Sequence, residues 1–408
     1  MRILTVANRY DRGGASRVAV TLHREFVKAG HQSVLVAGDT DLGYSADDLL
    51  ALGWRGRIVF KLLRYTEQMV LSRLYSGRSI RLSFGARIFS ERYLFGRFAP
   101  DVVHFHNAQP ELGFRLSRNV SWARRRFWTL HDSWIFTGGC HVPGDCSGYE
   151  MGCAECPAVR SGIAKMFVEN AFKRKHALYD NSSMRIIAPS RSVADYAKRS
   201  KISSNIKIIG NAVDVQKFWP VDKSVARQSL GWRQNCRTVL LGANFLDIAA
   251  KGIGELDALR AALKGGGEYQ FVVFGRLSNA RVSALPRDVL WLGHTANDDL
   301  LRIWYSAADV FVSLSHSETF GLTVAEAMAC GTPVAAWGVG GLHDIVDSHV
   351  NGVLVEMGDF AALSDGLRWV LGRSEIGELA VAKIRDVFAA DLIARDHIKA
   401  YRENWVSH

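Results

Sequence analysis

Two glutamates, Glu318 and Glu326, lie in the segment of the sequence that carries the most chemical information. The segment spans 315–334 and reads SHSETFGLTVAEAMACGTPV. It follows an expected strand and should open a helix near Gly321, where backbone N–H groups without intrahelical partners form an anion site. A carboxylate one turn into that helix, as Glu326 would be, can accept hydrogen bonds from the two hydroxyls of a ribose. The segment therefore predicts a nucleotide site, with Glu318 in the preceding loop and closer to a transferred group.

Two further segments have residue types that suit phosphate groups. Lys251 precedes Gly252 after an expected strand, and its ammonium could stabilise negative charge on a leaving group. Gly13 and Gly14 join the first expected strand to a helix, and glycines there let backbone N–H groups approach a phosphate. Each pattern is weak evidence by itself, because Lys-Gly pairs are common on surfaces and Gly-Gly pairs are common in turns.

Histidines stand at the ends of two expected strands in the first half of the chain. His131 follows a strand at 127–130, and His106 and Asn107 come at the end of another. Strand ends carry ligand-contacting side chains more often than cores do, so we expect His131 to contact a ligand. We assign His106 and Asn107 to the pocket of an acceptor, the molecule that would receive the transferred group. Hydrogen bonding within the core or a loop accounts for these two residues equally well.

Four of the six cysteines fall within 17 residues, at Cys140, Cys146, Cys153 and Cys156. In a cytoplasmic chain such a cluster indicates a metal site first, because four thiolates suit tetrahedral zinc and the last two form a Cys-x-x-Cys pair. The other spacings, of five and six residues, are less usual for zinc. We expect structural Zn²⁺, with disulfides and free buried thiols as the alternatives.

Asp39 and Asp41 form an Asp-x-Asp pattern, which can hold Mn²⁺ or Mg²⁺. Two aspartates after a strand are most often solvated turn residues. We therefore predict that the protein uses no catalytic metal.

Short β-rich runs alternate with amphipathic stretches along the whole chain, which is typical of βαβ units and parallel sheets. The polar segment 213–234 separates two such series and is the expected linker. We predict an N-terminal domain at 1–212, a C-terminal domain at 213–388 and a final helix at 389–408 that crosses back to the first domain. Ligands are expected at the carboxyl ends of the strands. The expected strands are 2–7, 33–37, 102–105, 127–130, 186–188, 206–209, 238–241, 271–274, 289–292, 310–313, 333–336 and 352–355.

Length and composition are those of a packed two-domain enzyme. The chain has 408 residues, of which 48% are hydrophobic and 22% charged. No apolar run approaches the ~20 residues that a membrane-spanning helix needs. The first residues suit a short buried strand better than a secretory signal, so we expect a cytoplasmic protein.

The net charge of +11 is concentrated in 54–98, where ten Lys/Arg face two Glu. Because apolar residues are interleaved there, the segment could lie on an anionic membrane surface, at the inner face of the plasma membrane. A solvated helical face is an equally good interpretation. No helix-turn-helix, zinc-finger or RNP pattern accompanies the charge, and we expect no nucleic-acid partner.

Over nearly its whole length the sequence resembles the retaining glycosyltransferases of the GT-B fold, of the family 4 or group 1 type. The resemblance rests on Glu318 and Glu326 with Phe-Gly-Leu between them, on Lys251-Gly252, on the N-terminal glycine loop and on the strand-end His131. The cysteine loop, after His-Asp-x-Trp-x-x-Thr-Gly, is similar to that of a subgroup of bacterial exopolysaccharide transferases of the colanic-acid type.

The resemblance implies two Rossmann-like domains whose parallel sheets face a deep cleft. It implies metal-independent transfer of a sugar, with retained configuration, from a UDP- or GDP-sugar to a hydroxyl of a saccharide or lipid-linked oligosaccharide in exopolysaccharide assembly. Glu318, Lys251 and His131 would form the catalytic centre. Many relatives have an arginine upstream of the lysine; Asn244 stands in that region here, and Arg276 is the candidate to replace it. The implied donor-binding residues are Gly13, Gly14, Asn211, Asn244, Arg276, Phe320, Gly321, Leu322, Thr323 and Glu326.

Two other functions are compatible with these motifs. A GT-B-like nucleotide-sugar epimerase would convert the donor with no acceptor present. A non-catalytic scaffold would bind the nucleotide sugar and recruit other enzymes, but the presence of Glu318, Lys251 and Glu326 together disfavours it.

Overall fold

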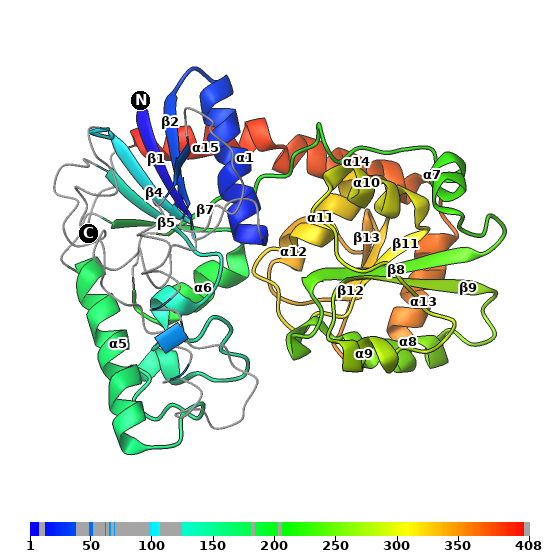
Figure 1. Cartoon of the computed structure of the whole chain (residues 1–408), viewed down its shortest axis with the longest axis horizontal. Helices are drawn as coiled ribbons and strands as arrows, with labels where there is room; N and C mark the ends of the chain where they lie inside the picture. The colour runs from blue at the N-terminus through cyan, green and yellow to red at the C-terminus, as the bar shows by residue number, and fades with distance from the viewer. Residues whose placement is uncertain are drawn as a thin grey trace. The chain divides into compact units, whose positions relative to one another are not determined.

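The computed structural model describes residues 1–7, 13–37, 49–51, 62, 65–66, 69, 98–106, 125–180, 184–202 and 206–403. The chain divides into unit 1, formed by Met1–Gly210 together with Ala394–His408, and unit 2, formed by Asn211–Ile393. Each unit contains its own parallel sheet (Figure 1). The predicted domain borders were 212/213 and 388/389.

Unit 1 is built on a sheet in which the described strands have the order β3-β2-β1-β4-β5-β6-β7, all parallel. The strands are apolar along most of their length because a parallel sheet is buried on both faces; all five side chains of β4 are buried. The strands are β1 Arg2–Ala7, β2 Gln32–Ala37, β3 Leu49–Ala51, β4 Val102–His106, β5 Arg125–Thr129, β6 Met184–Ala188 and β7 Ile206–Ile208. The other elements among the described residues of unit 1 are α1 Gly14–Lys28, η1 Trp134–Phe136, η2 Gly148–Met151, α5 Gly162–Asp180, α6 Arg191–Arg199 and the end of α15 Ala390–Arg402.

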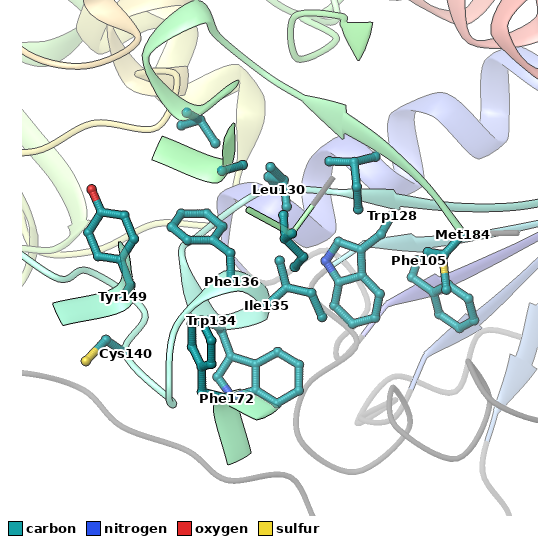
Figure 2. Close-up of a cluster of buried hydrophobic side chains, with 14 of the residues drawn as sticks. Phe105, Trp128, Leu130, Trp134, Ile135, Phe136, Cys140, Tyr149, Phe172 and Met184 are labelled. Atoms are coloured by element: carbon teal, nitrogen blue, oxygen red, sulfur yellow. The ribbon is translucent and has the colours of Figure 1, made fainter. Parts of the chain in front are cut away.

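Large aromatic side chains fill the core of unit 1 next to the end of β5 (Figure 2). Phe105 stacks on Trp128 with ring centroids 5.5 Å apart, and Trp128 stacks on Trp134 at 6.2 Å. Trp134 belongs to η1, three residues after His131. The stacked rings therefore fix the chain on both sides of His131.

Unit 2 is built on a sheet with the strand order β10-β9-β8-β11-β12-β13, also parallel throughout. The strands are β8 Arg237–Phe245, β9 Tyr269–Arg276, β10 Leu290–Trp291, β11 Val310–Ser313, β12 Val334–Trp337 and β13 Gly352–Val355. The helices are α7 Lys223–Leu230, η3 Ala249–Lys251, η4 Ile253–Glu255, α8 Leu256–Ala262, α9 Asn279–Ser283, α10 Asp298–Ala307, α11 Leu322–Ala329, α12 Leu342–Ile345, α13 Phe360–Leu371, α14 Glu375–Lys383, η5 Ile384–Phe388 and the start of α15.

The α/β class with parallel sheets is confirmed. A strand is present wherever the sequence predicts one, although β8 and β9 are longer than expected and β3 is additional. The segment 213–234, which we expected to be a linker, lies in unit 2 and forms α7, whose N-terminus is capped by the Asp222 carboxylate. Val213 forms a parallel bridge with Ala389, so the chain's exit into unit 2 and its return toward unit 1 are hydrogen-bonded to each other.

Each sheet has one switch point, a pair of neighbouring strands from which the chain connections run toward opposite edges of the sheet. It lies between β1 and β4 in unit 1 and between β8 and β11 in unit 2. Ligands of open α/β sheets bind at the carboxyl ends of the strands at such a point. Among the helices that the structure describes, none is long and apolar enough to span a membrane.

Candidate functional site

Lys251 and Glu318 meet at the carboxyl end of the unit 2 sheet, beside the β8/β11 switch point. Lys251 follows β8 and Glu318 follows β11, and Lys251 Nζ lies 2.5 Å from Glu318 Oε1. Both side chains are largely buried, with 24% and 13% of their surfaces exposed. A charged pair shielded from water interacts more strongly than a surface pair. Two of the three residues that the sequence predicts for the catalytic centre are thus held together at the place where an α/β sheet binds its ligand.

Backbone contact between the two loops fixes this pair. Gly252 adopts φ +68°, and a Cβ added there would lie 1.9 Å from the carbonyl oxygen of Leu314. The backbone N–H of His316 donates to the carbonyl of Ala250 at 2.8 Å. Glycine after Lys251 is therefore required by the close approach of the loop that carries Glu318.

The N-terminus of α11 is shaped by a second set of glycines. Gly321 has φ +101°, and an added Cβ would lie 2.3 Å from Leu342 Cδ2. The N–H of Gly341 donates to the carbonyl of Glu318 at 2.8 Å, while a Cβ on Gly340 would lie 2.0 Å from the same oxygen. The turn after β12 thus supports the Glu318 loop. Sequence reasoning missed this turn, although its Gly-x-Gly-Gly after a strand is a visible signal.

The predicted donor-binding residues of this loop lie around the start of the same helix. Phe320 is buried, Gly321 is the N-cap, and Leu322 and Thr323 are the first two residues of α11. No side chain caps this helix end, so its first N–H groups are available to an anion.

Glu326 is buried in α11, with 3% of its surface exposed. The hydroxyl of Tyr305, in α10, donates to Glu326 Oε2 at 3.0 Å. The Tyr305 ring in turn packs edge-on against Phe274 and Phe311. A buried carboxylate needs such a donor, because desolvating an unpaired charge is costly. Tyr305 is a site residue that the sequence did not reveal.

Asn244 and Arg276 lie at the adjacent carboxyl ends of β8 and β9. Asn244 Oδ1 is 2.9 Å from His294 Nε2, and the Arg276 guanidinium stacks over the Phe245 ring, 5.2 Å from its centroid. Burial, and then the charge of Arg276, lower the pKa of His294. Both predicted residues are thus at the same edge of the sheet as Lys251. Asn211, also predicted, is buried at the start of unit 2.

Glu255 joins the Glu318 loop to the end of β12. Its Oε1 contacts His316 Nε2, and its Oε2 accepts a hydrogen bond from Trp337 Nε1 at 3.2 Å. Neither Glu255 nor His316 was predicted, because the contact joins positions 61 residues apart.

In unit 1, His131 stands just after β5 and contacts a second predicted residue, His106. His106 Nδ1 is 2.9 Å from His131 Nε2. We expected His106 to line an acceptor pocket, but its side chain is fully buried behind His131, because β4 is an interior strand. Burial lowers the pKa of His131 to about 4, although the charge of Asp132 acts in the opposite direction. Gly13, with φ +90°, is the N-cap of α1, and Gly14 is its first residue.

The cysteine loop is anchored next to His131. His141 Nδ1 lies 2.8 Å from Asp132 Oδ2, and the N–H of Ser133 donates to the His141 carbonyl at 2.9 Å. The loop that follows β5 is therefore positioned to influence whatever His131 binds.

The structure describes all four of the clustered cysteines at which the sequence predicts a zinc site. All four are free thiols. Within the described part of the chain, no three His, Cys, Asp or Glu side chains are grouped closely enough to hold a metal ion. Burial raises the pKa of Cys140, of Cys153 (to about 11) and of Cys156. Cys140, Cys153 and Cys156 are buried and Cys146 is half-buried, and structural zinc stays a prediction.

Three predicted features lie outside the described residues. They are Asn107, the Asp39/Asp41 pair, and nearly all of the basic segment 54–98.

Comparison with known proteins gives two family matches. The model described as Glycosyltransferase Family 4 matches residues 12–217, and that described as Glycosyl transferases group 1 matches residues 246–373. The D-inositol 3-phosphate glycosyltransferase of Geodermatophilus obscurus is 33% identical over 322 residues, which cover 74% of this chain and 66% of that protein. The enzyme of the same name from Mycobacterium marinum is 29% identical over 65% of this chain and 55% of its own length. The match thus spans less than two thirds of these relatives.

Solved structures resemble this chain over nearly its full length. Sucrose-phosphate synthase from Thermosynechococcus elongatus has a TM-score of 0.70 at 20% identity and covers 98% of both chains. Anabaena HepE in complex with UDP-glucose has a TM-score of 0.66 at 17% identity, with 98% and 99% covered. WaaG has a TM-score of 0.63 at 14% identity, with 99% and 100% covered. At these identities the likeness shows the fold, which is GT-B. Since the family 4 model alone covers half of the sequence, the chain belongs to Glycosyltransferase Family 4.

Proposed function

We propose that this protein transfers a sugar from a nucleotide-diphosphate sugar to a hydroxyl acceptor, with retention of the anomeric configuration and without a catalytic metal. The observation that carries the proposal is the Lys251–Glu318 pair at the β8/β11 switch point. Membership of family 4 supports the same reaction.

Each residue around the switch point has a chemical task in this proposal. Lys251 and the free N–H groups at the start of α11 stabilise the negative charge that develops on the departing nucleoside diphosphate. Glu326, held by Tyr305, accepts hydrogen bonds from the ribose hydroxyls. Glu318 orients Lys251 and lies on the side of the transferred sugar.

The relatives suggest which donor nucleotide and which acceptor molecules should be tested first. HepE was crystallised with UDP and UDP-glucose, which makes UDP-sugars the first donors to test. The curated relatives are named for D-inositol 3-phosphate. We therefore propose two acceptor classes, a phosphorylated cyclitol and a lipid-linked saccharide of exopolysaccharide assembly. The resemblance to exopolysaccharide transferases rests on the cysteine loop alone.

Donor binding is tested by thermal unfolding against a panel of UDP-, GDP- and ADP-sugars. A ligand at about 100 times its Kd stabilises the native state by about 2.7 kcal/mol, which raises Tm by several degrees. We expect one nucleotide class to give this shift and Glu326→Ala to reduce it. If no sugar nucleotide raises Tm and none is consumed, the proposal fails.

Turnover separates the three candidate functions. With donor and an acceptor panel containing lipid-linked saccharides and inositol phosphates, a transferase forms a glycosylated product. An epimerase converts donor in the absence of acceptor. A scaffold shows the Tm shift without any product.

A further inference from the structure

Glu255 connects the two loops that carry Lys251 and Glu318. Its Oε1 contacts His316 Nε2, and its Oε2 accepts a hydrogen bond from Trp337 Nε1 at 3.2 Å. Trp337 is the last residue of β12 and is fully buried. One oxygen of Glu255 is therefore bound to a fixed side chain of the core, while the other oxygen contacts the loop that carries Glu318.

The backbone of Glu255 is also fixed. Glu255 ends η4, and its N–H donates to the carbonyl of Gly252 at 2.9 Å. Ile253 and Leu256, on either side of it in the sequence, are buried in the same core cluster as Trp337. A side chain on such a fixed turn can hold a neighbouring loop in one place, because little conformational freedom remains to be lost.

His316 contacts the segment that contains Lys251 at two points. Its N–H donates to the carbonyl of Ala250 at 2.8 Å, and its ring contacts Glu255. Ala250 immediately precedes Lys251, and Glu255 follows it by four positions. Since Glu318 lies two residues after His316, one short loop supplies the ion-pair partner of Lys251 and the contacts on each side of it.

The Lys251–Glu318 pair is not a lasting connection between the loops during the proposed reaction. Among the residues that the structure describes, each is the only ion-pair partner of the other. In the reaction Lys251 faces the diphosphate and Glu318 faces the transferred sugar, so donor binding weakens their mutual attraction. The contact between Glu255 and His316 involves neither of these two charges and does not depend on the pair being intact.

We propose that Glu255 and His316 are positioning residues that keep the ammonium of Lys251 beside the diphosphate when donor binding weakens the Lys251–Glu318 pair. The inference rests on the proposed function, and it explains why two residues without a chemical task in that function lie beside Lys251. A misplacement of about 1 Å can cost roughly a hundredfold in rate, so a small displacement of Lys251 should be measurable.

Steady-state kinetics of two Glu255 variants test the proposal in the full-length protein. Glu255→Leu removes both side-chain contacts, and kcat should fall roughly tenfold or more. Glu255→Gln should retain most of kcat, because its amide oxygen can accept from Trp337 while its NH₂ group donates to a neutral imidazole. Asp257→Asn is the matched control, since Asp257 is two residues away and 77% exposed. Equal kcat in Glu255→Leu and in the control overturns the inference.

A double-mutant cycle with Lys251 separates positioning from a general loss of structure. Positioning acts through the ammonium, so adding Glu255→Leu to Lys251→Ala should lower kcat by less than about twofold more. A general loss of structure would lower kcat by the same factor in both backgrounds, and that result contradicts the inference.

His316→Leu keeps the test decisive if Glu255→Leu fails to fold because the buried Trp337 Nε1–H lacks an acceptor. The His316 side chain is 40% exposed, and its replacement should leave the fold intact. His316→Leu should reproduce the loss of kcat and should cost little in the Lys251→Ala background. A wild-type kcat, or the same loss in both backgrounds, would mean that His316 does not act through Lys251.

Failure of the proposed function gives a different result. If the wild type consumes no sugar nucleotide and none raises its Tm, the reaction is wrong. Thermal unfolding without ligand then tests the contact itself: the double variant Glu255→Leu/His316→Leu should lower Tm by less than the sum of the two single shifts. Additive shifts overturn the pairing. If the wild type consumes donor and the variants match its kcat, only the positioning inference fails.

Discussion

Lys251 and Glu318 bring opposite charges from two loops to one point at the edge of the unit 2 sheet. Their residue types and their places after strands were visible in the sequence, and so was the Lys-Gly pair. Their pairing was not, because it joins positions 67 residues apart. Glu326 was also visible, whereas its partner Tyr305 looks in the sequence like any aromatic residue of an amphipathic helix.

Lys251→Ala should lower kcat by roughly a hundredfold, because it removes a fixed positive charge from the site where the leaving diphosphate becomes charged. The free energy of unfolding should fall by roughly 1–3 kcal/mol, because the largely buried Glu318 carboxylate loses its partner. Lys264→Ala, which changes an exposed lysine of unit 2, is the control. Steady-state kinetics and urea unfolding measure both effects. A kcat within twofold of wild type would remove Lys251 from the catalytic centre.

Two glycines, Gly252 and Gly321, shape the loops that carry the site, and a larger residue at either position would clash with its surroundings. Gly252 and Gly321 both have positive φ and both lie against other parts of unit 2, within reach of any added side chain. The helix start at Gly321 could be predicted from the local sequence. The contact of Gly252 with Leu314 could not, because it depends on β8 and β11 being neighbours in the sheet.

Gly252→Ala is expected to destabilise unit 2 by roughly 3 kcal/mol and to abolish most of the activity, because strain at positive φ adds to a backbone clash. Gly231→Ala is a matched control. Gly231 has φ +66°, almost the same as Gly252, but no atom lies within 4 Å of its added Cβ. It should lose only about 1 kcal/mol and retain activity. Urea unfolding and turnover are measured for both variants. A larger loss of stability and activity in Gly252→Ala shows that the loop contact, and not backbone strain alone, holds Lys251 in place. Equal losses of stability and activity in the two variants would argue against the contact.

The chain leaves unit 1, builds unit 2 and returns through α15, whose last residues complete unit 1. Tyr401 from this helix contacts His104, and its ring also packs against Phe127 with centroids 4.7 Å apart. The fold of unit 1 therefore depends on both ends of the chain. We predicted the return of the last helix from the pattern along the chain, but the buried histidines of β4 on which it packs have no signature in the sequence.

Acid should destabilise unit 1 through these buried histidines. Above pH 6.5, His104 and His106 are neutral in both the folded and unfolded states and add no pH dependence. Below pH 6.5 the unfolded chain binds protons that the folded state excludes, because burial lowers the folded pKa of both rings. Stability therefore falls with pH, by up to about 2 kcal/mol per ring between pH 6.5 and 5.0. The groups that face the rings are His131 and Thr129 from β5 and its end, and His397 and Tyr401 from α15.

Urea unfolding at pH 7.5 and 5.0 measures this loss. His104→Asn should show a smaller difference between the two pH values, whereas His349→Gln, at an exposed position, serves as the control. A difference that is the same in wild type and His104→Asn would assign the acid sensitivity to other groups.

The sequence alone determined the order of strands and helices, the α/β class and the residue types at strand ends, because hydrophobic periodicity, glycine turns and helix caps act over a few neighbouring residues. The spacing of the cysteine cluster predicted zinc, whereas the burial of Cys140, Cys153 and Cys156 is known only from the packing of the loop. Only the tertiary structure decided that Lys251 pairs with Glu318, that Tyr305 holds Glu326 and that Tyr401 ends a chain of histidines behind His131. Each of these contacts joins residues from different elements. Their formation depends on which strands are neighbours in the sheet and on how side chains fill the space between helices and strands, and neither is encoded in a local pattern.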